Sequence, residues 1–291
     1  MTPHRARIAP AAGAAPALRR IALAATAALC DELALAPKPG LVSFADSGSH
    51  HDMDAGTFLR SLYALRPYFE DIAGLGWRLA PFAALQASGI AAEARMLAAT
   101  GGINTHRGAV FSLGLLCAAA GAALRASPGG ALAPGRVRAE LLARWGDALD
   151  ARSRSASPLP GGVVARRHKL RSASMEAAAG FPTLFERAWP ALDAGLRRGL
   201  RPEQARLDAL FHAMAALDDT NLVHRGGMAG LAYARDAARA FLADGGAGRP
   251  DGGAAAASAL HRAFVARRMS PGGAADTLAA ACLLQRLQAV A

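Results

Sequence analysis

The residues that fill β-strands are scarce in this chain, and that scarcity limits its fold more than any other feature. Among 291 residues the sequence holds eight Val, five Ile and eight Thr, and aromatic residues make up 5%. Strands favour β-branched and aromatic side chains, whereas Ala, Leu and Arg, which are plentiful here, favour helices. The sequence therefore predicts an all-α fold.

Hydrophobic residues make up 53% of the chain, a share that is ample for burying the core of a folded protein. Two loops rich in Pro, Gly, Ser and Arg, at residues 126–135 and 150–162, do not separate regions of different composition. We therefore expect one helical domain over residues 17–291, a multi-helix bundle, behind a disordered tail over residues 1–16. The second loop is long enough to be mobile.

Two helices have clear signals in the sequence. A helix is expected from about Asp54 to Gly74, because hydrophobic residues recur there at helical spacing. A last helix is expected from the dipeptide Ser270-Pro271 to about Leu287, since the first turn of a helix tolerates Pro. The hydrophobic residues that define the first of these helices are Phe58, Leu62, Leu65 and Phe69.

Membrane proteins and disulfide scaffolds are both disfavoured. A membrane span needs roughly 18 apolar residues, and the stretch Ile21 to Cys30 ends at two acids. The cysteines are odd in number, far apart and in no Cys-x-x-Cys pair, which predicts neither a disulfide framework nor a thiolate metal site. We expect a cytoplasmic protein without membrane contact. The three cysteines are Cys30, Cys117 and Cys282.

The formal net charge of +11 suggests a polyanionic partner. The Arg residues are dispersed, however, and no basic stretch is interleaved with aromatic residues, so the pattern does not favour nucleic acid. A cleft in a basic protein attracts small polyanions such as nucleotides through the field around it. We therefore expect a small-molecule partner.

Lysine is rare enough to be informative. Of 33 basic residues only two, Lys38 and Lys169, are Lys. A compact ammonium fits between phosphate oxygens or beside a reacting centre where a planar guanidinium does not. Both positions are candidates for binding phosphate, with chance as the alternative.

Asparagine is equally rare, and both copies stand before a His-Arg-Gly. Asn104 precedes His106 and Arg107 after a Gly-Gly turn, so it is a natural N-cap that gathers both side chains at the positive end of a helix. Asn221 and Arg225 are four residues apart and share one helical face. The simpler alternative is that each Asn only caps or ends a turn.

The densest cluster of ionisable residues is His50-His51-Asp52-Met53-Asp54. Asp52 and Asp54 share a site only if Asp52 precedes the helix, since two helical residues at that spacing point about 200° apart. No third soft ligand accompanies the two His residues, so the cluster does not predict a zinc site. Carboxylates together with substrate phosphates favour Mg²⁺ instead. The alternative is that these acids only complement the helix dipole.

Three further acids are candidates for proton transfer or cation binding. Glu176 follows a basic stretch, Asp219 precedes Asn221, and Asp276 lies in the opening turns of the last helix. Asp218, by contrast, is interpreted as a surface acid.

Six motifs in this chain occur in the order in which one protein family has them. Together they resemble the triphosphoribosyl-dephospho-CoA synthases, and they span about residues 18–290. One departure is Arg107, which stands where many members have Lys. The motifs cover residues 37–42, 48–54, 102–114, 180–182, 219–221 and 270–276.

The resemblance implies an all-helical enzyme with a central nucleotide-binding cleft. Such enzymes take ATP, as its Mg²⁺ complex, and 3′-dephospho-CoA, join the 2′-hydroxyl of the dephospho-CoA ribose to C1 of the ATP ribose, and release adenine. The product is the prosthetic-group precursor of malonate decarboxylase or citrate lyase, and a separate transferase passes it to the carrier protein. The solitary chain resembles the malonate decarboxylase branch more closely, and a homodimer is left open.

The residues and the resemblance together suggest roles for individual side chains. Glu176 is the expected base, with Asp219 and Asp52 as further catalytic acids, because a carboxylate stabilises positive charge on the sugar ring. Mg²⁺ or the ribose is assigned to Asp52, Asp54 and Asp219. Substrate and phosphate contacts are assigned to Lys38, His51, Asn104, His106, Arg107, Lys169, Arg171, Asn221, Arg225 and Asp276.

Two other functions use the same residue types. One is a helical, metal-dependent hydrolase that cuts the N-glycosidic or phosphate bond of a nucleotide and transfers the released group to water. The other is a basic adaptor that binds nucleic acid without catalysis, and whose affinity falls steeply with salt.

Overall fold

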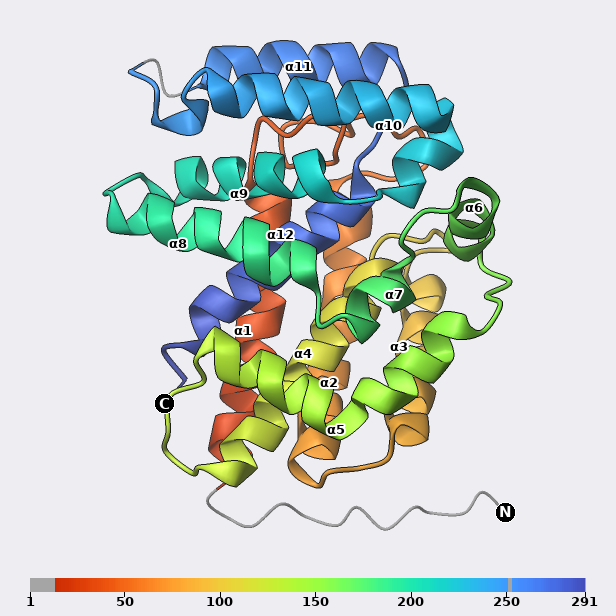
Figure 1. Ribbon diagram of the computed structural model, residues 1–291, viewed down its shortest axis with the longest axis vertical. Coiled ribbons are helices and arrows are strands. Elements are labelled where there is room, and N and C mark those ends of the chain that lie inside the picture. The colour runs from red at the N-terminus through yellow and green to blue at the C-terminus, as the bar shows by residue number, and fades with distance from the viewer. Residues whose placement is uncertain (1–13, 251–252, 291) are drawn as a thin grey trace.

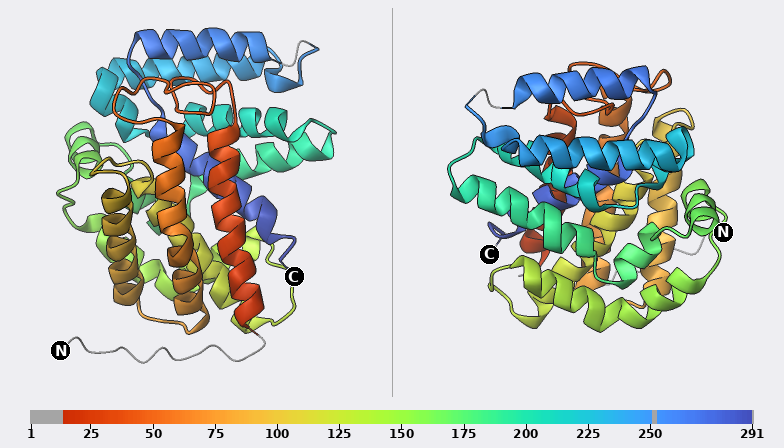
Figure 2. Two further views of the ribbon diagram at one scale, coloured as in Figure 1. Left: turned by 180° about the vertical axis from the view of Figure 1, so that it is seen from behind. Right: turned by 45° about the horizontal axis from the view of Figure 1, so that its top comes forward.

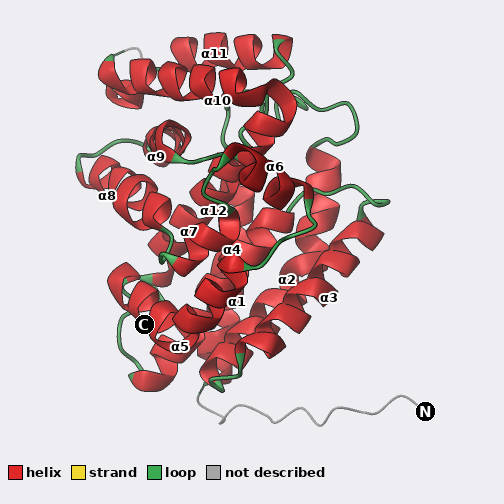
Figure 3. Ribbon diagram, turned by 45° about the vertical axis from the view of Figure 1, so that its right-hand side comes forward, coloured by secondary structure: helices red, strands yellow, loops and turns green. Residues whose placement is uncertain are grey.

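The computed structural model describes residues 14–250 and 253–290, and within these ranges it contains helices and loops but no strand (Figure 3). The all-α prediction is confirmed. The α-helices are α1 (Ala15–Ala34), α2 (Ala55–Trp77), α3 (Phe82–Ala99), α4 (Arg107–Ala126), α5 (Pro134–Arg154), α6 (Pro160–His168), α7 (Ala173–Ala178), α8 (Trp189–Arg197), α9 (Pro202–Ala216), α10 (Thr220–Ala243), α11 (Ala254–Ala266) and α12 (Gly272–Leu287). A π-helical turn, η1 (Leu184–Ala188), leads into α8, and a 3₁₀ turn, η2 (Gly246–Gly248), follows α10.

The helices form two layers joined by α12. Helices α1, α2 and α3 lie side by side, with α4 and α5 packed on them, and α8 to α11 stack across one end (Figures 1 and 2). Helix α12 runs between the layers and contacts α1, α4, α8 and α9. One hydrophobic core is continuous through all of these elements, as expected of a single domain.

Helix α4 is the central helix of the larger layer. Every residue from Leu113 to Leu124 is buried, and the backbones of α2 and α4 approach so closely that a Cβ on Gly76 would lie 1.9 Å from the carbonyl oxygen of Ala118. Among the described helices, α4 is also the one long and apolar enough to cross a membrane, yet 78% of its apolar window is buried inside the protein. Its apolar character therefore serves core packing. The sequence analysis had not singled out this helix.

Both helices with clear sequence signals occur as predicted. Asp54 is the N-cap of α2, which ends three residues beyond Gly74, and α12 ends at Leu287. Helix α1 begins at Ala15, inside the expected tail, whose residues 1–13 lie outside the described part of the chain.

The prediction of a long loop over residues 150–162 is wrong. Helix α5 continues to Arg154, which pairs with Asp150 one turn earlier, and α6 begins at Pro160, a residue suited to a first helical turn. Only residues 155–159 connect the two helices. The other expected loop is found between Ala126 and Pro134.

Candidate active site

A pocket opens where the N-terminal ends of α4, α7, α10 and α12 meet. It is open to solvent, and four of the residues that line it are acids. The N-terminal ends of helices carry free backbone N–H groups and positive dipole ends, and Asp219 accepts from two of these N–H groups, at the starts of α10 and α12. The polar residues that line it are Ser112, Arg171, Glu176, Thr183, Asp218, Asp219, Thr220, Asp276 and Thr277.

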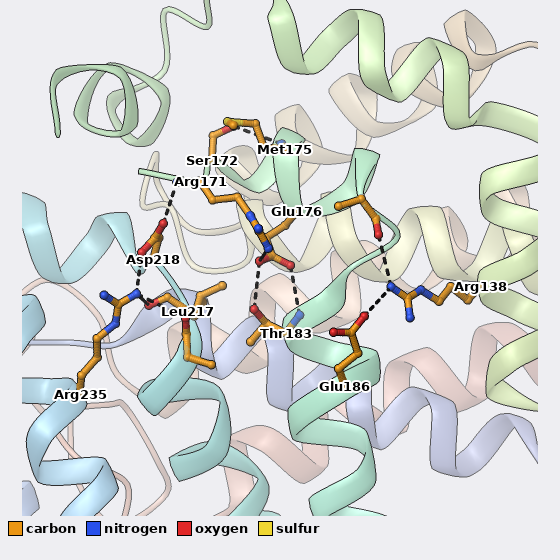
Figure 4. Close-up of polar contacts among 12 residues, drawn as sticks. Arg138, Arg171, Ser172, Met175, Glu176, Thr183, Glu186, Leu217, Asp218 and Arg235 are labelled. Carbon is orange, nitrogen blue, oxygen red and sulfur yellow. Dashed lines mark hydrogen bonds and ion pairs between the residues drawn. The ribbon is translucent and has the colours of Figure 1, made fainter. Parts of the chain in front are cut away.

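Glu176 lies on α7 with its carboxylate surrounded by donors (Figure 4). The Oγ1 and the backbone N–H of Thr183 donate to it over 3.0 and 3.3 Å, and Nη1 of Arg171 lies 3.4 Å from Oε1. Both oxygens of this carboxyl group therefore accept hydrogen bonds. The sequence analysis did not identify Thr183, whose place beside Glu176 depends on the turn before η1.

Asp218 was interpreted as a surface acid, and the structure corrects this. Its Oδ2 accepts the backbone N–H of Arg171 at 2.8 Å, and its Oδ1 lies 2.5 Å from Nη2 of Arg235 on α10 (Figure 4). Asp218 therefore fixes the Arg171 segment at the edge of the pocket, and it lines the pocket itself.

Asp219 connects two helix N-termini inside the protein. It is the N-cap of α10, with Oδ1 accepting from the backbone N of Asn221 at 2.9 Å, while Oδ2 accepts from the backbone N of Ala274 on α12 at 3.1 Å. Burial raises the pKa of Asp219 to about 6, although these backbone donors oppose the rise. Its carboxylate is therefore occupied by the backbone, which positions α10 and α12 around the pocket.

Asp276 lies on the first turns of α12 against the N-terminus of α4. A Cβ added to Gly108 would lie 1.9 Å from its Oδ2, so this close approach needs a glycine. Burial raises the pKa of Asp276 well above its ordinary value, and the charges of Glu32 and Asp219 raise it further, against one backbone donor from Ala109. A position beside other carboxyl groups does not favour a phosphate contact, whereas the substrate contact also predicted for Asp276 stays a prediction.

Lys38 is buried, and its ammonium faces an acid of its own chain. Its Nζ lies 2.5 Å from Oε1 of Glu32 and 2.6 Å from the carbonyl oxygen of the same residue, with none of the side chain exposed. The ammonium therefore does not reach the pocket, contrary to the prediction that it binds phosphate there. The sequence analysis missed Glu32, although it falls on the apolar stripe of α1 that Ile21, Ala25 and Ala28 define.

His106 is buried and neutral. Its Nδ1 lies 2.6 Å from Oγ of Ser61, its ring stands edge-on to Phe58, and its Nε2 is buried without a partner. Burial lowers the pKa of His106 to about 3, and the charge of Lys38 contributes. A neutral, enclosed imidazole does not bind phosphate as a cation, so this prediction is corrected as well.

The expected anion site at the start of α4 is only partly formed. Oδ1 of Asn104 accepts the backbone N–H of Arg107 at 3.2 Å, so Asn104 caps a free donor as predicted, although the N-cap position itself is taken by His106. The guanidinium of Arg107 pairs with Glu93 on α3 instead of facing the pocket.

Arg225 contacts the loop before α2. Its Nη2 lies 3.1 Å from Nδ1 of His50, its Nη1 donates to the carbonyl of Ser49 at 3.2 Å, and Nε2 of His50 lies 3.0 Å from Oγ of Ser270. Three sequence motifs thus meet here, outside the pocket. Asn221 also packs on the α12 turn, since a Cβ on Gly272 would lie 2.7 Å from its Nδ2.

The three acids assigned to Mg²⁺ do not come together. Asp52 and Asp54 are exposed, and Asp54 accepts the backbone N–H of Thr57 at 2.8 Å, the capping role that was the alternative. Asp219 is buried beneath α10. Within the described ranges no group of three His, Cys, Asp or Glu residues is placed to hold a metal ion.

Of the predicted site residues, the pocket therefore unites Arg171, Glu176, Asp219 and Asp276. His51 and Lys169 are exposed, and Lys169 caps the end of α6 in a left-handed conformation with φ 55°. The predicted residues that do not line the pocket are Lys38, His51, Asp52, Asp54, Asn104, His106, Arg107, Lys169, Asn221 and Arg225.

An all-helical domain whose pocket gathers ionisable carboxyl groups with shifted pKa values has the site of an enzyme. Comparison with known proteins identifies which kind. The chain belongs to the ATP:dephospho-CoA triphosphoribosyl transferase family, whose model matches residues 18–291, and it is a transferase.

Relatives with the name of this activity cover most of the chain. It is 40% identical over 265 residues to the 2-(5′′-triphosphoribosyl)-3′-dephosphocoenzyme-A synthase of Pectobacterium atrosepticum, which covers 88% of this chain and 85% of the relative. It is also 40% identical over 271 residues to the synthase of the same name from Klebsiella pneumoniae, covering 92% of this chain and 94% of the relative. No solved structure matches.

Proposed function

We propose that this protein transfers the triphosphoribosyl group of ATP to the 2′-hydroxyl of 3′-dephospho-CoA and releases adenine, and that the reaction takes place in the pocket between α4, α7, α10 and α12. The observation that carries the assignment is that carboxyl groups from two separate sequence motifs, residues 219–221 and 270–276, line one pocket together with Glu176. Breaking the bond between ribose and adenine builds positive charge on the sugar, and nearby carboxylates stabilise that charge.

Glu176 is the proposed base. Its carboxyl group lines the pocket, accepts from Thr183 and Arg171, and is placed to take the proton of the attacking 2′-hydroxyl. Thr183 and Arg171 orient it toward the pocket, and their hydrogen bonds leave it further acceptor positions.

Phosphate groups are proposed to bind at the edge of the pocket where Arg171 lies. Arg171 is exposed and belongs to the basic segment 166–171, which also contains Lys169. The triphosphate is not the leaving group, so contacts to it serve to position C1 of the ribose.

Mg²⁺ is proposed to enter as part of MgATP. The described residues do not fit a resident metal site, because no three ligating side chains converge. Mg²⁺ commonly keeps most of its ligands as water and phosphate oxygens, so a protein site built from several carboxylates is not required.

The product is proposed to be the precursor of the prosthetic group of a carrier protein. A separate transferase in the cytoplasm then attaches this group to the carrier protein. The resemblance of this chain to the malonate decarboxylase branch favours malonate decarboxylase over citrate lyase as the enzyme served. A homodimer remains compatible with this function.

The test is mass spectrometry of a reaction that contains the protein, ATP, 3′-dephospho-CoA and Mg²⁺. We expect equal amounts of adenine and triphosphoribosylated dephospho-CoA. Free ribose triphosphate or ADP would instead identify a hydrolase, and no turnover together with salt-sensitive binding of nucleic acid would identify an adaptor.

A further inference from the structure

Three carboxyl groups and one ammonium lie behind and at the wall of the pocket, where the charges of neighbouring groups act on one another. Glu32 on α1, Asp219 before α10 and Lys38 are at most 5% exposed, and Asp276 on α12 stands between this interior and the pocket. The charges of Glu32 and Asp219 both act on Asp276. His106, nearby on α4, is neutral and contributes no compensating charge.

Three carboxylates beside one ammonium are unfavourable where water is scarce, because charges in a poorly solvated environment repel strongly. The ammonium of Lys38 is bonded to Glu32 and compensates its charge. Four backbone N–H groups donate to Asp219, those of Asn221, Leu222, Gly273 and Ala274.

Asp276 is the carboxyl group that remains. It has a single backbone donor, from Ala109, and faces two other acids. Its contact with Gly108 also places it at the pocket wall, where a substrate can reach it. A neutral carboxylic acid at the wall of a reaction pocket is able to donate its proton.

We propose that Asp276 is the general acid of the reaction, which donates its proton to the departing adenine. This inference rests on the proposed function, because it assigns a role within the same pocket. Glu176 and Asp276 then have different roles because their surroundings differ: hydrogen-bond donors surround Glu176, the base, whereas burial and two neighbouring acids favour the protonated form of Asp276.

The step balances without a further reactant. The bond between C1 of the ribose and N9 of adenine breaks, and N9 keeps the electron pair. The proton of Asp276 moves to another ring nitrogen, so adenine leaves as a neutral molecule. The 2′-oxygen of dephospho-CoA bonds to C1 and loses its proton to Glu176. Solvent then returns one proton to Asp276 and takes one from Glu176.

The test compares two donor substrates that differ only in their need for an acid. One is ATP, and the other is p-nitrophenyl β-D-riboside 5′-triphosphate, whose leaving group departs as an anion without a proton. For Asp276→Asn we expect kcat with ATP to fall by about 10²- to 10⁴-fold, and kcat with the nitrophenyl substrate to stay within about tenfold of the native value. Glu176→Gln should lose turnover with both substrates, because both need the base.

The matched control is Asp236→Asn, an Asp on the exposed side of α10 that pairs with Arg239, and it should behave as native. Circular dichroism checks that Asp276→Asn is folded. If the folded variant keeps native turnover with ATP, or loses turnover with both substrates equally, Asp276 is not the acid. If the native protein itself releases no adenine from ATP and dephospho-CoA, the proposed function fails first.

The native enzyme provides a second test that does not depend on the folding of any variant. The rate with ATP should fall at alkaline pH as Asp276 loses its proton, and this alkaline limb should be absent with the nitrophenyl substrate. An identical alkaline limb with both substrates would overturn the proposal.

Discussion

The ammonium of Lys38 lies 2.5 Å from Oε1 of Glu32, six residues earlier in the chain, and neither side chain is more than 7% exposed. Burial lowers the pKa of Lys38, and the charge of Glu32 opposes that effect. The carbonyl oxygen of Lys38 is bound in turn by Nδ1 of His261 on α11, at 2.5 Å. This lysine therefore joins α1, its following loop and α11.

Lys38→Ala should reduce the free energy of unfolding by about 3–5 kcal/mol, because it leaves the charge of Glu32 buried without a partner. Urea denaturation measures this loss. The double variant Lys38→Met with Glu32→Leu should recover most of it, since both charges are then gone. Equal losses in the single and double variants would contradict the explanation.

A matched change in an exposed ion pair supplies the control. Arg197 pairs with Asp193 one turn earlier on α8, and 74% of its side chain is exposed. Arg197→Ala should change the free energy of unfolding by no more than about 0.5 kcal/mol, because exposed pairs contribute little.

Glu176→Gln should lower kcat by about 10²- to 10⁴-fold and leave the KM for ATP nearly unchanged, because the amide keeps the shape of the side chain but cannot take a proton. Steady-state kinetics of adenine release measure both constants. Glu186→Gln is the control, since Glu186 is nearby but exposed and paired with Arg138 (Figure 4). Native kcat in Glu176→Gln would assign the base to another residue.

Gly108→Ala should remove most of the turnover, because its Cβ would lie 1.9 Å from Oδ2 of Asp276 and would displace that side chain from the pocket wall. Gly146→Ala on α5 is the control, since its Cβ has no neighbour closer than 4.0 Å. This control should keep its activity and gain about 0.5–1 kcal/mol in the free energy of unfolding. Adenine release and urea denaturation of both variants test the prediction, and native turnover in Gly108→Ala would refute it.

His106 should make the protein less stable as the pH falls from about 6.5 to about 3. Its pKa is lowered to about 3 in the folded state, whereas unfolded His takes up a proton near pH 6.5. The folded state therefore binds fewer protons in this window, and its free energy of unfolding falls by up to about 1.4 kcal/mol per pH unit.

Asp219 acts in the opposite direction, because its raised pKa of about 6 lets the folded state take up a proton first. The contribution of His106 is therefore obtained as the difference between the native protein and His106→Asn, which keeps a polar atom for Ser61. Urea denaturation from pH 7 to pH 4 should give the native protein the steeper loss of stability. Parallel curves would show that His106 is protonated in the folded state.

The helices were predictable from local sequence. Asp54 begins α2 and Leu287 ends α12 as expected, because capping residues and hydrophobic periodicity act over a few neighbouring positions. The extent of α5 was not predicted, since Pro, Gly and Ser suggested a loop where an ion pair and helix packing extend the helix to Arg154.

The residues along the chain predicted that it is helical, marked its rare Lys, Asn and clustered acids as site candidates, and indicated the family that its ordered motifs resemble. That Glu176, Asp219 and Asp276 line one pocket, while Lys38 and His106 are enclosed in the interior, follows from the packing of the helices. Helical signals depend on neighbours in the chain, whereas the surroundings of a side chain depend on helices that are distant in sequence. Glu32 and Asp276 are separated by 244 positions, and only packing brings their charges together.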